Sequence, residues 1–318
     1  MKTISLIIPT YNEEESLHIL YEELCGLTQS LPHYSWEILF VNDGSNDKSA
    51  SIIDTFVEQD NRVAVVELSR NFGKEAAMLA GFDYVQGDCA IVLDADLQHP
   101  ISVIPQMIEY WEEGYDDVYV RRRSRGDSTP LRRMLSRCYY SLLQHASNID
   151  VLPDVGDFRL LDRKCIDSLK LLREQCRYTK GMYAWIGFRK KEIVCDLHER
   201  IAGKSKWGLG QLLNLAIEGV TSFSVTPLRI SSILGFIISL IAFIYMIIVL
   251  TKTLIWGDPV AGYPSLMCII LFLGGIQLLS LGIIGEYLGR IFNETKNRPT
   301  YIAREYKKRK ENQGHSDN

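Results

Sequence analysis

Short apolar runs alternate with helix-like patterns through the N-terminal part of the chain. Runs that are apolar almost throughout predict strands buried on both faces; they are Ile4–Pro9, Trp36–Val41, Val63–Leu68 and Ala90–Leu93, and Tyr115–Val120 is a further strand. Helices are predicted between them, over Leu17–Leu27, Ser49–Gln59, Glu75–Val85 and from Pro100 to about Glu113. Asn12 is a candidate N-terminal cap for the first helix. This repeated strand–helix order predicts an α/β domain with a mostly parallel, doubly wound, Rossmann-like sheet.

A different pattern begins near residue 230. Residues 230–251 and 264–285 carry no charged side chain, and the first of these segments would reach roughly 33 Å as a helix, enough for a bilayer core. A short polar loop, residues 252–263, separates them. Two transmembrane helices are therefore expected, and Gly274, Gly275 and Gly282 would allow close helix packing.

Polar residues follow the predicted strands at the edge where a parallel sheet binds its ligands. Asp43, Lys74, Asp94 and Asp96 all fall at this edge. The two carboxylates of Asp94-Ala-Asp96 would point opposite ways in an extended strand, so a turn must bring them together to share an ion. Carboxylate oxygens suit Mg²⁺ or Mn²⁺. The alternative is a surface turn that happens to hold two aspartates.

Composition narrows the possible functions. The net charge of −4 argues against nucleic-acid binding, and the seven cysteines are scattered without metal-like spacing. The chain has no G-x-G-x-x-G after the first strand and no G-x-x-x-x-G-K-[ST], so a dehydrogenase and a P-loop kinase are poorly supported. Most of the surplus of apolar residues lies after Arg229, in the segments expected to span a membrane.

Four motifs in order resemble one family. They are Pro9-Thr-Tyr-Asn-Glu13, Val41-Asn-Asp-Gly-Ser45, Ser69-Arg-Asn-Phe-Gly-Lys74 and Asp94-Ala-Asp-Leu-Gln98. Together they resemble the inverting family 2 glycosyltransferases of GT-A fold, and more narrowly the polyprenyl-phosphate glycosyltransferases, which include dolichol-phosphate mannose synthase and bactoprenol glucosyltransferase. The resemblance runs nearly end to end.

The resemblance implies roles for matching positions. It implies that Asp94 and Asp96 bind Mg²⁺ or Mn²⁺, with Gln98 as a further ligand. The implied nucleotide-sugar-binding residues are Pro9, Tyr11, Asn12, Glu13, Asp43, Lys74, Asp94 and Ala95. For Tyr11 alone, a packing aromatic is an equally good interpretation.

Basic segments supply candidate ligands for the acceptor phosphate. Arg122 and Arg125 belong to an arginine run after a predicted strand, where guanidinium groups suit phosphate oxygens. The segment 198–207 resembles the family's R-x-x-G-x-S-K motif, which implies Arg200, Lys204, Ser205 and Lys206. The alternative for the arginine run is a solvated face.

Asp157 lies in Val155-Gly-Asp-Phe-Arg-Leu-Leu-Asp162-Arg163, which resembles a segment of the bacterial glucosyltransferase branch. By this resemblance Asp157 is the catalytic carboxylate on the acceptor side, either as a base or as an orienting group. The alternative, an aspartate that caps the helix starting near Arg163, fits Asp162 better.

The expected organisation has four parts. A GT-A catalytic domain spans 1–206, an amphipathic interfacial helix and linker 207–229, two transmembrane helices 230–291 and a basic cytoplasmic tail 292–318. A core helix is the alternative for the amphipathic segment. The positive-inside rule places both termini in the cytoplasm of a bacterial inner membrane protein, and a homo-oligomer, possibly a tetramer, is expected.

The predicted function is the metal-dependent transfer of a sugar, with inversion, from a nucleotide sugar to undecaprenyl phosphate or another polyprenyl phosphate. UDP-glucose is the expected donor, and the product would serve cell-envelope glycan or O-antigen modification. Alternatives are a transferase using GDP-mannose or a UDP-amino sugar, and a non-enzymatic protein that binds or flips the lipid carrier. A processive polysaccharide synthase would carry a Q-x-x-R-W motif, which is missing. Two spans are few for a transporter.

Overall fold

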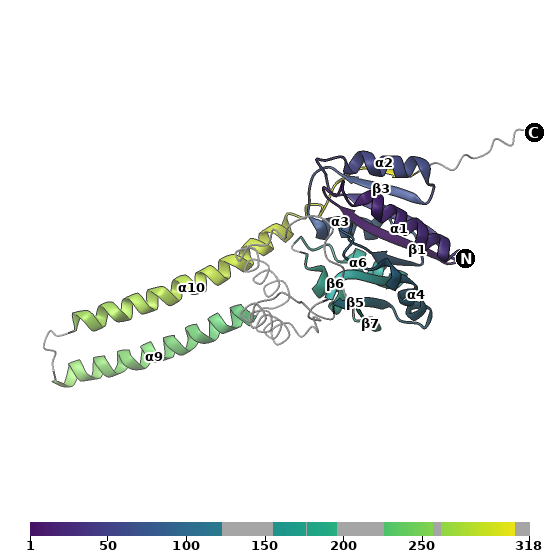
Figure 1. The fold of residues 1–318 in the computed structure, drawn as a ribbon. Helices are drawn as coiled ribbons and strands as arrows, with labels where there is room; N and C mark the ends of the chain where they lie inside the picture. The colour runs from purple at the N-terminus through teal and green to yellow at the C-terminus, as the bar shows by residue number, and fades with distance from the viewer. Residues whose placement is uncertain (123–154, 176, 196–225, 257–261, 309–318) are drawn as a thin grey trace, which may run out of the picture.

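The computed structural model describes residues 1–122, 155–175, 177–195, 226–256 and 262–308. Its centre is a mixed sheet with the strand order β7-β5-β6-β4-β1-β2-β3-β8 (Figure 1). The strands are β1 (Thr3–Thr10), β2 (Ser35–Asn42), β3 (Val63–Leu68), β4 (Cys89–Val92), β5 (Asp117–Arg122), β6 (Val155–Asp162), β7 (Lys190–Cys195) and β8 (Ala303–Lys308).

Helices cover both faces of this sheet. Those of the globular domain are α1 (Leu17–Ser30), α2 (Ser49–Gln59), α3 (Lys74–Tyr84), α4 (Ile104–Glu112), α6 (Arg163–Leu171) and α7 (Thr179–Trp185), and a 3₁₀ turn, Ile101–Val103, precedes α4. Strands β4, β1, β2 and β3 pair in parallel, and so do β5 and β7. The predicted α/β class with a mostly parallel sheet is confirmed.

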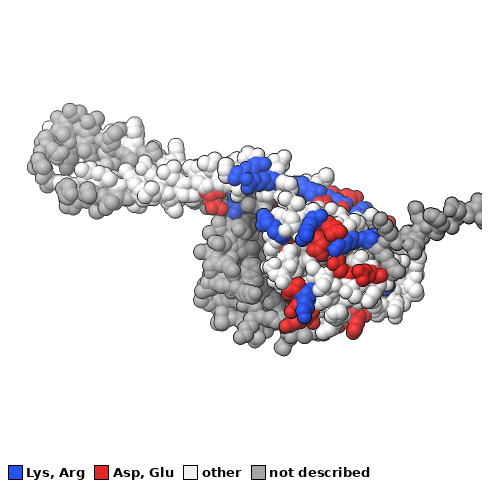
Figure 2. Space-filling model, turned by 90° about the horizontal axis from the view of Figure 1, so that it is seen from above, with Lys and Arg blue, Asp and Glu red and all other residues white. Residues whose placement is uncertain are grey.

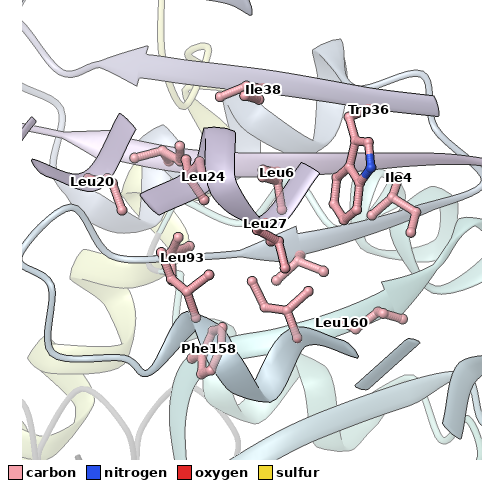
Figure 3. Packing of buried hydrophobic residues seen from close by; sticks show 14 of the residues in the cluster. Ile4, Leu6, Leu20, Leu24, Leu27, Trp36, Ile38, Leu93, Phe158 and Leu160 are labelled. Atoms are coloured by element: carbon pink, nitrogen blue, oxygen red, sulfur yellow. The ribbon is translucent and has the colours of Figure 1, made fainter. Parts of the chain in front are cut away.

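Alternation along the central strand builds the core on each face of the sheet. Ile4, Leu6 and Ile8 of β1 pack in a cluster with residues of α1, α2 and α4. Figure 3 shows part of this cluster. Ile7 points to the opposite face and joins a second cluster with residues of α3, α6 and α7. Successive side chains of a strand point to opposite faces, so one strand supplies both cores.

Two strands run against the parallel direction. Strand β6 pairs antiparallel with both β4 and β5, and β8 pairs antiparallel with β3 at the edge of the sheet. The sequence analysis predicts neither strand. It assigns β8 to the basic tail 292–318, because Ala303–Lys308 is an edge strand whose side chains are mostly exposed and polar and so lacks an apolar run.

Asn12 does not cap the first helix, contrary to the prediction. Helix α1 begins at Leu17, with Ser16 at the cap position and no capping hydrogen bond from its side chain. Asn12 has a left-handed backbone, with φ 55°, and turns the chain before the helix starts. Its Oδ1 accepts from the Asn46 N–H at 2.8 Å, so Asn12 joins the loop after β1 to the loop after β2.

Asp162 does cap a helix, as predicted. Helix α6 begins at Arg163, and the Asp162 carboxylate accepts a hydrogen bond from the Lys164 N–H at 3.1 Å. The second Asp162 oxygen accepts from Trp111 Nε1 at 2.7 Å, which also ties α4 to the end of β6.

Two long helices, α9 (Thr226–Trp256) and α10 (Tyr263–Thr295), lie side by side and extend away from the globular domain (Figure 1). Among the described residues, the stretch Phe272–Thr295 is long and apolar enough to cross a membrane, and Ser231–Tyr245 is a shorter apolar stretch. Figure 2 shows Lys, Arg, Asp and Glu gathered on the globular domain, whereas the visible described surface of the hairpin is largely free of them.

The chain returns from α10 to the central sheet through several polar contacts. Glu294 Oε1 accepts from the Gln175 N–H at 2.8 Å, and the Tyr301 hydroxyl donates to Asp83 at 2.6 Å. The Ile302 carbonyl then accepts from the Ser69 N–H at 2.9 Å, at the end of β3. The end of the hairpin is therefore fixed to the domain at both α3 and β3.

A chain ending after Tyr301 should be less stable than the full chain, because β3 becomes an exposed edge and the Ser69 N–H loses its partner. We expect a fall in the melting temperature of about 5 °C or more and faster amide exchange in β3. A chain ending after Lys308 is the matched control and should keep the full stability. Equal melting temperatures for both truncations would contradict a structural role for β8.

Candidate active site

A pocket of about 290 Å³ opens at the carboxyl ends of β1, β2 and β4. Loops after these strands and the start of α3 form its walls, as expected for an open parallel sheet. Its lining residues are Pro9, Thr10, Tyr11, Glu13, Asp43, Asn71, Gly73, Lys74, Ala77, Asp94, Ala95 and Asp96.

Asp43 fixes the loop that leads into α3. Its two carboxylate oxygens accept from the backbone N–H groups of Phe72, at 2.7 Å, and Gly73, at 2.9 Å. Burial raises the pKa of Asp43, and these two hydrogen bonds oppose the rise. Gly44 is needed beside it, because φ is +68° there and a Cβ would come within 2.6 Å of the Arg70 carbonyl carbon. Asp43 thus shapes the pocket wall as well as lining it.

Lys74, the first residue of α3, joins two carboxylates. Its Nζ lies 2.6 Å from Asp94 Oδ1 and 2.7 Å from Asp157 Oδ2. Burial would raise the pKa of Asp94, but the charge of Lys74 and a contact with His99 outweigh burial and hold it well below its usual range. Burial likewise would lower the pKa of Lys74, and the two carboxylates raise it instead. The site therefore holds a lysine cation shared between two carboxylates.

The antiparallel strand β6 brings Asp157 to this position. Val92 of β4 pairs with Arg159 of β6, and continuing that register by two residues places Asp157 opposite Asp94. The Asp157 Oδ1 atom is buried and has no hydrogen-bond partner among the described residues. Asp157 thus has one oxygen on Lys74 and one that is left for another group.

His99 also contacts Asp94, although the sequence analysis gives it no role. Its Nε2 lies 3.4 Å from Asp94 Oδ2, and its ring stacks on Phe158 with the centroids 4.8 Å apart. Phe158 is the neighbour of Asp157 in β6, so His99 bridges the two carboxylate-bearing segments. Its position directly after the Asp94–Gln98 motif is the signal that could have identified it.

Asp94 and Asp96 provide two hard oxygen donors on one wall of the pocket. Leu97, directly after these residues, has a φ of 59° and turns the chain there. Among the described residues, no group of three or more His, Cys, Asp or Glu side chains is placed to hold a metal ion. The two carboxylates fit Mg²⁺ or Mn²⁺ if the substrate's phosphate oxygens and water complete the coordination.

Most of the residues predicted to bind the nucleotide sugar line this pocket, whereas several other predicted site residues do not. Asn12 and Gln98 do not line the pocket; the Gln98 N–H donates to Asp96 Oδ1 at 3.2 Å. Arg122 is the last residue of β5. Arg125, Arg200, Lys204, Ser205 and Lys206 lie outside the described residues. The pocket wall also includes Thr10, Asn71, Gly73 and Ala77, for which the sequence analysis predicts no role. Three of them, Thr10, Asn71 and Gly73, lie within motifs that carry the family resemblance.

Comparison with known proteins places this geometry in a family. The model for Glycosyl transferase family 2 matches residues 5–169, and the chain belongs to that family. The model for the GtrB C-terminal hairpin matches residues 226–291, which cover α9 and most of α10. The protein is therefore a glycosyltransferase with a GtrB-type hairpin after its catalytic domain.

Several relatives are similar in sequence to this chain along nearly their whole length. An uncharacterized glycosyltransferase of Synechocystis is 43% identical over 94% of this chain and 94% of its own. The SfII prophage-derived bactoprenol glucosyl transferase of Shigella flexneri is 43% identical over 95% of this chain and 97% of its own. The prophage bactoprenol glucosyl transferase homolog of Escherichia coli is 43% identical over 96% and 99%.

Replacing Lys74 with methionine should leave Asp94 and Asp157 without their shared cation. Because Lys74 lowers the pKa of Asp94, the stability it contributes is present above the ordinary pKa of aspartate and is lost as the pH falls. We expect Lys74→Met to lose about 2 kcal/mol of unfolding free energy at pH 7, less than for a fully buried pair because the Lys74 side chain is 43% exposed. The loss should shrink below about pH 4, near the ordinary pKa of aspartate.

Denaturant unfolding of the purified wild type and of Lys74→Met, at pH 7 and below about pH 4, measures the difference in unfolding free energy at each pH. Lys2→Met is the matched control, since Lys2 pairs with Glu112 on the exposed surface. A loss for Lys74→Met that stays constant with pH would contradict the ion-pair explanation.

Proposed function

We propose that the protein transfers glucose from UDP-glucose to undecaprenyl phosphate, with inversion at the anomeric carbon, at the cytoplasmic face of a bacterial membrane. One observation carries this proposal: a family 2 pocket, with Asp94 and Asp96 beside the Lys74–Asp157 pair, is joined to a long apolar hairpin. Relatives named bactoprenol glucosyl transferase share the whole arrangement.

The pocket would hold the nucleotide sugar. Tyr11, whose side chain is 42% exposed at the pocket, offers a ring for the base, and Asp43 and Glu13 offer carboxylates to the base or ribose. Asp94 and Asp96 would hold Mg²⁺ or Mn²⁺, which when bound neutralises the charge of the leaving diphosphate. Gln98, whose backbone bonds Asp96, would support that carboxylate rather than line the pocket.

Asp157 and Lys74 would serve the acceptor. A phosphate monoester has a second pKa near 6 and is mostly dianionic at pH 7, so its attacking oxygen needs little help from a base. The ion pair of 2.7 Å between Lys74 and Asp157 supports an orienting role, in which Asp157 holds the lysine cation toward the incoming phosphate. An acceptor oxygen then bonds to the anomeric carbon as the bond from that carbon to the diphosphate breaks.

The hairpin would bring the catalytic pocket to the bilayer surface, where the phosphate of a polyprenyl lipid lies. Helices of 31 and 33 residues reach about 46 to 50 Å, longer than a bilayer core. Their exposed apolar side chains, such as Phe236, Ile241 and Phe272, would then face lipid. We infer two membrane spans from this length and surface.

Membranes containing the protein should move radiolabelled glucose from UDP-glucose to undecaprenyl phosphate. In a panel of labelled nucleotide sugars, we expect UDP-glucose to give the highest rate, with GDP-mannose and UDP-amino sugars far lower. EDTA should stop transfer, and Mg²⁺ or Mn²⁺ should restore it, because Asp94 and Asp96 need the cation to neutralise the leaving group.

Asp157→Asn is the control for the chemistry. It should lose most turnover while its binding of UDP-glucose survives, since Asp157 does not line the donor pocket. Transfer in metal-free buffer would overturn the metal site, a different preferred donor would overturn the choice of sugar, and lipid binding without any transfer would favour a carrier protein.

Labelling of single cysteines should test the two-span topology. A cysteine placed at Gly257, between α9 and α10, should react with an impermeant thiol reagent added outside the cell. A cysteine placed at Ser316 should not react, because both termini are expected in the cytoplasm. The unsubstituted chain is the control for its native cysteines, and the reverse labelling pattern would refute this topology.

A further inference from the structure

A third carboxylate lies directly behind the Lys74–Asp157 pair. Glu75 follows Lys74 in α3, and its Oε2 accepts hydrogen bonds from the Thr179 N–H, at 3.1 Å, and from the Thr179 hydroxyl. Thr179 is the first residue of α7, so Glu75 joins the helix that carries Lys74 to α7. The function described above gives Glu75 no role.

Charged groups from several elements surround Glu75. Asp157 of β6 adds negative charge, while Lys74 of α3 and Arg177, just before α7, add positive charge. Tyr183 of α7 lies within the electrostatic reach of both Glu75 and Asp157. With Asp94, which pairs with Lys74, and Glu174, which lies near Arg177, four carboxylates thus surround these two cations on the proposed acceptor side of the site.

Several polar atoms of this cluster are buried without a hydrogen-bond partner in the described structure. They are Asp157 Oδ1, Arg177 Nε and Nη2, and the Tyr183 hydroxyl. Buried polar atoms are rarely left without partners, so within the described structure these atoms mark places where a further polar group, such as water or a substrate oxygen, can bind. Because Glu75 interacts electrostatically with the residues that carry these atoms, its charge should affect the binding of any charged group there.

Burial, with the nearby Asp157 as the next cause, raises the pKa of Glu75 to about 7. The Thr179 N–H, Arg177 and Lys74 oppose this rise and limit its size. Glu75 is therefore mostly neutral below pH 7 and mostly ionised above it.

We propose that Glu75 sets the charge of the acceptor side of the active site, and that its neutral form admits the acceptor's phosphate. This inference rests on the function proposed above. When Glu75 is neutral, Lys74 and Arg177 face one negative charge fewer and can attract a phosphate dianion. When Glu75 ionises, its negative charge competes for the same cations and repels the phosphate. Affinity for the acceptor should therefore fall as the pH rises, whereas affinity for the donor should not change.

Glu75→Gln tests this proposal, because glutamine keeps an oxygen for Thr179 but cannot ionise. The affinity of the purified full chain for farnesyl phosphate, without a donor, would be measured by calorimetry from about pH 6 to about pH 8, on either side of the pKa of Glu75. Ionisation of the ligand is common to both proteins. We expect the wild type to lose on the order of tenfold more affinity across this range than Glu75→Gln, the effect of one pKa unit of coupling.

Glu109→Gln is the matched control. Glu109 is an exposed carboxylate of α4, which packs on the opposite face of the sheet from α3, so its removal should leave the pH dependence of the wild type unchanged. Unchanged affinity for UDP-glucose in Glu75→Gln would show that the variant is folded. A pH dependence in Glu75→Gln equal to that of the wild type, or one matched by Glu109→Gln, would overturn the role of Glu75.

The wild type alone gives a second measure should Glu75→Gln fail to fold. Binding of farnesyl phosphate near pH 7.5 should take up protons, because the bound dianion raises the pKa of Glu75 further. Heats measured in buffers of different ionisation enthalpy report this uptake, and its absence would overturn the inference. Failure of the wild type to bind farnesyl phosphate at any pH would instead refute the proposed acceptor, and the inference with it.

Discussion

The contact of the Lys74 ammonium with Asp94 and Asp157 is the interaction on which the site depends. It joins residues from α3, the turn after β4 and strand β6, which are distant in sequence. Without a cation, two carboxylates this close would repel each other and resist ionisation. Lys74 thus holds the pKa of Asp94 low and keeps the Asp157 side chain beside it.

The architecture around this contact brings two parts of the sheet together. The pocket opens at the ends of β1, β2 and β4, where side chains from parallel strands converge. Asp157 comes from β6, which runs antiparallel to β4 beside it, and Lys74 lies between Asp157 and Asp94 of the pocket wall. The reversal of this strand therefore sets the two carboxylates against each other across a single lysine, which in the proposed function would divide the acceptor side from the donor side.

The sequence alone predicts what depends on local patterns. Apolar runs locate β1 to β4. The predicted bounds of the helix Ser49–Gln59 and of the strand Val63–Leu68 agree with α2 and β3 to the residue. The motifs that carry the family resemblance supply most of the pocket wall. Local patterns fail where pairing is long-range: β6 and β8 are defined by strands far away in the chain. Glu75 and His99 carry no periodic signal, because their importance comes from Asp157 and Asp94, which only the fold brings near.

The position of β8 after the hairpin affects the order in which the molecule can form. The sheet edge at β3 stays open while α9 and α10 are being synthesised, because the strand that covers it follows both helices in the chain. Completion of the sheet must therefore follow synthesis of the hairpin. In this way the maturation of the catalytic domain depends on the hairpin, because the segment that leaves α10 is the one that closes the β3 edge.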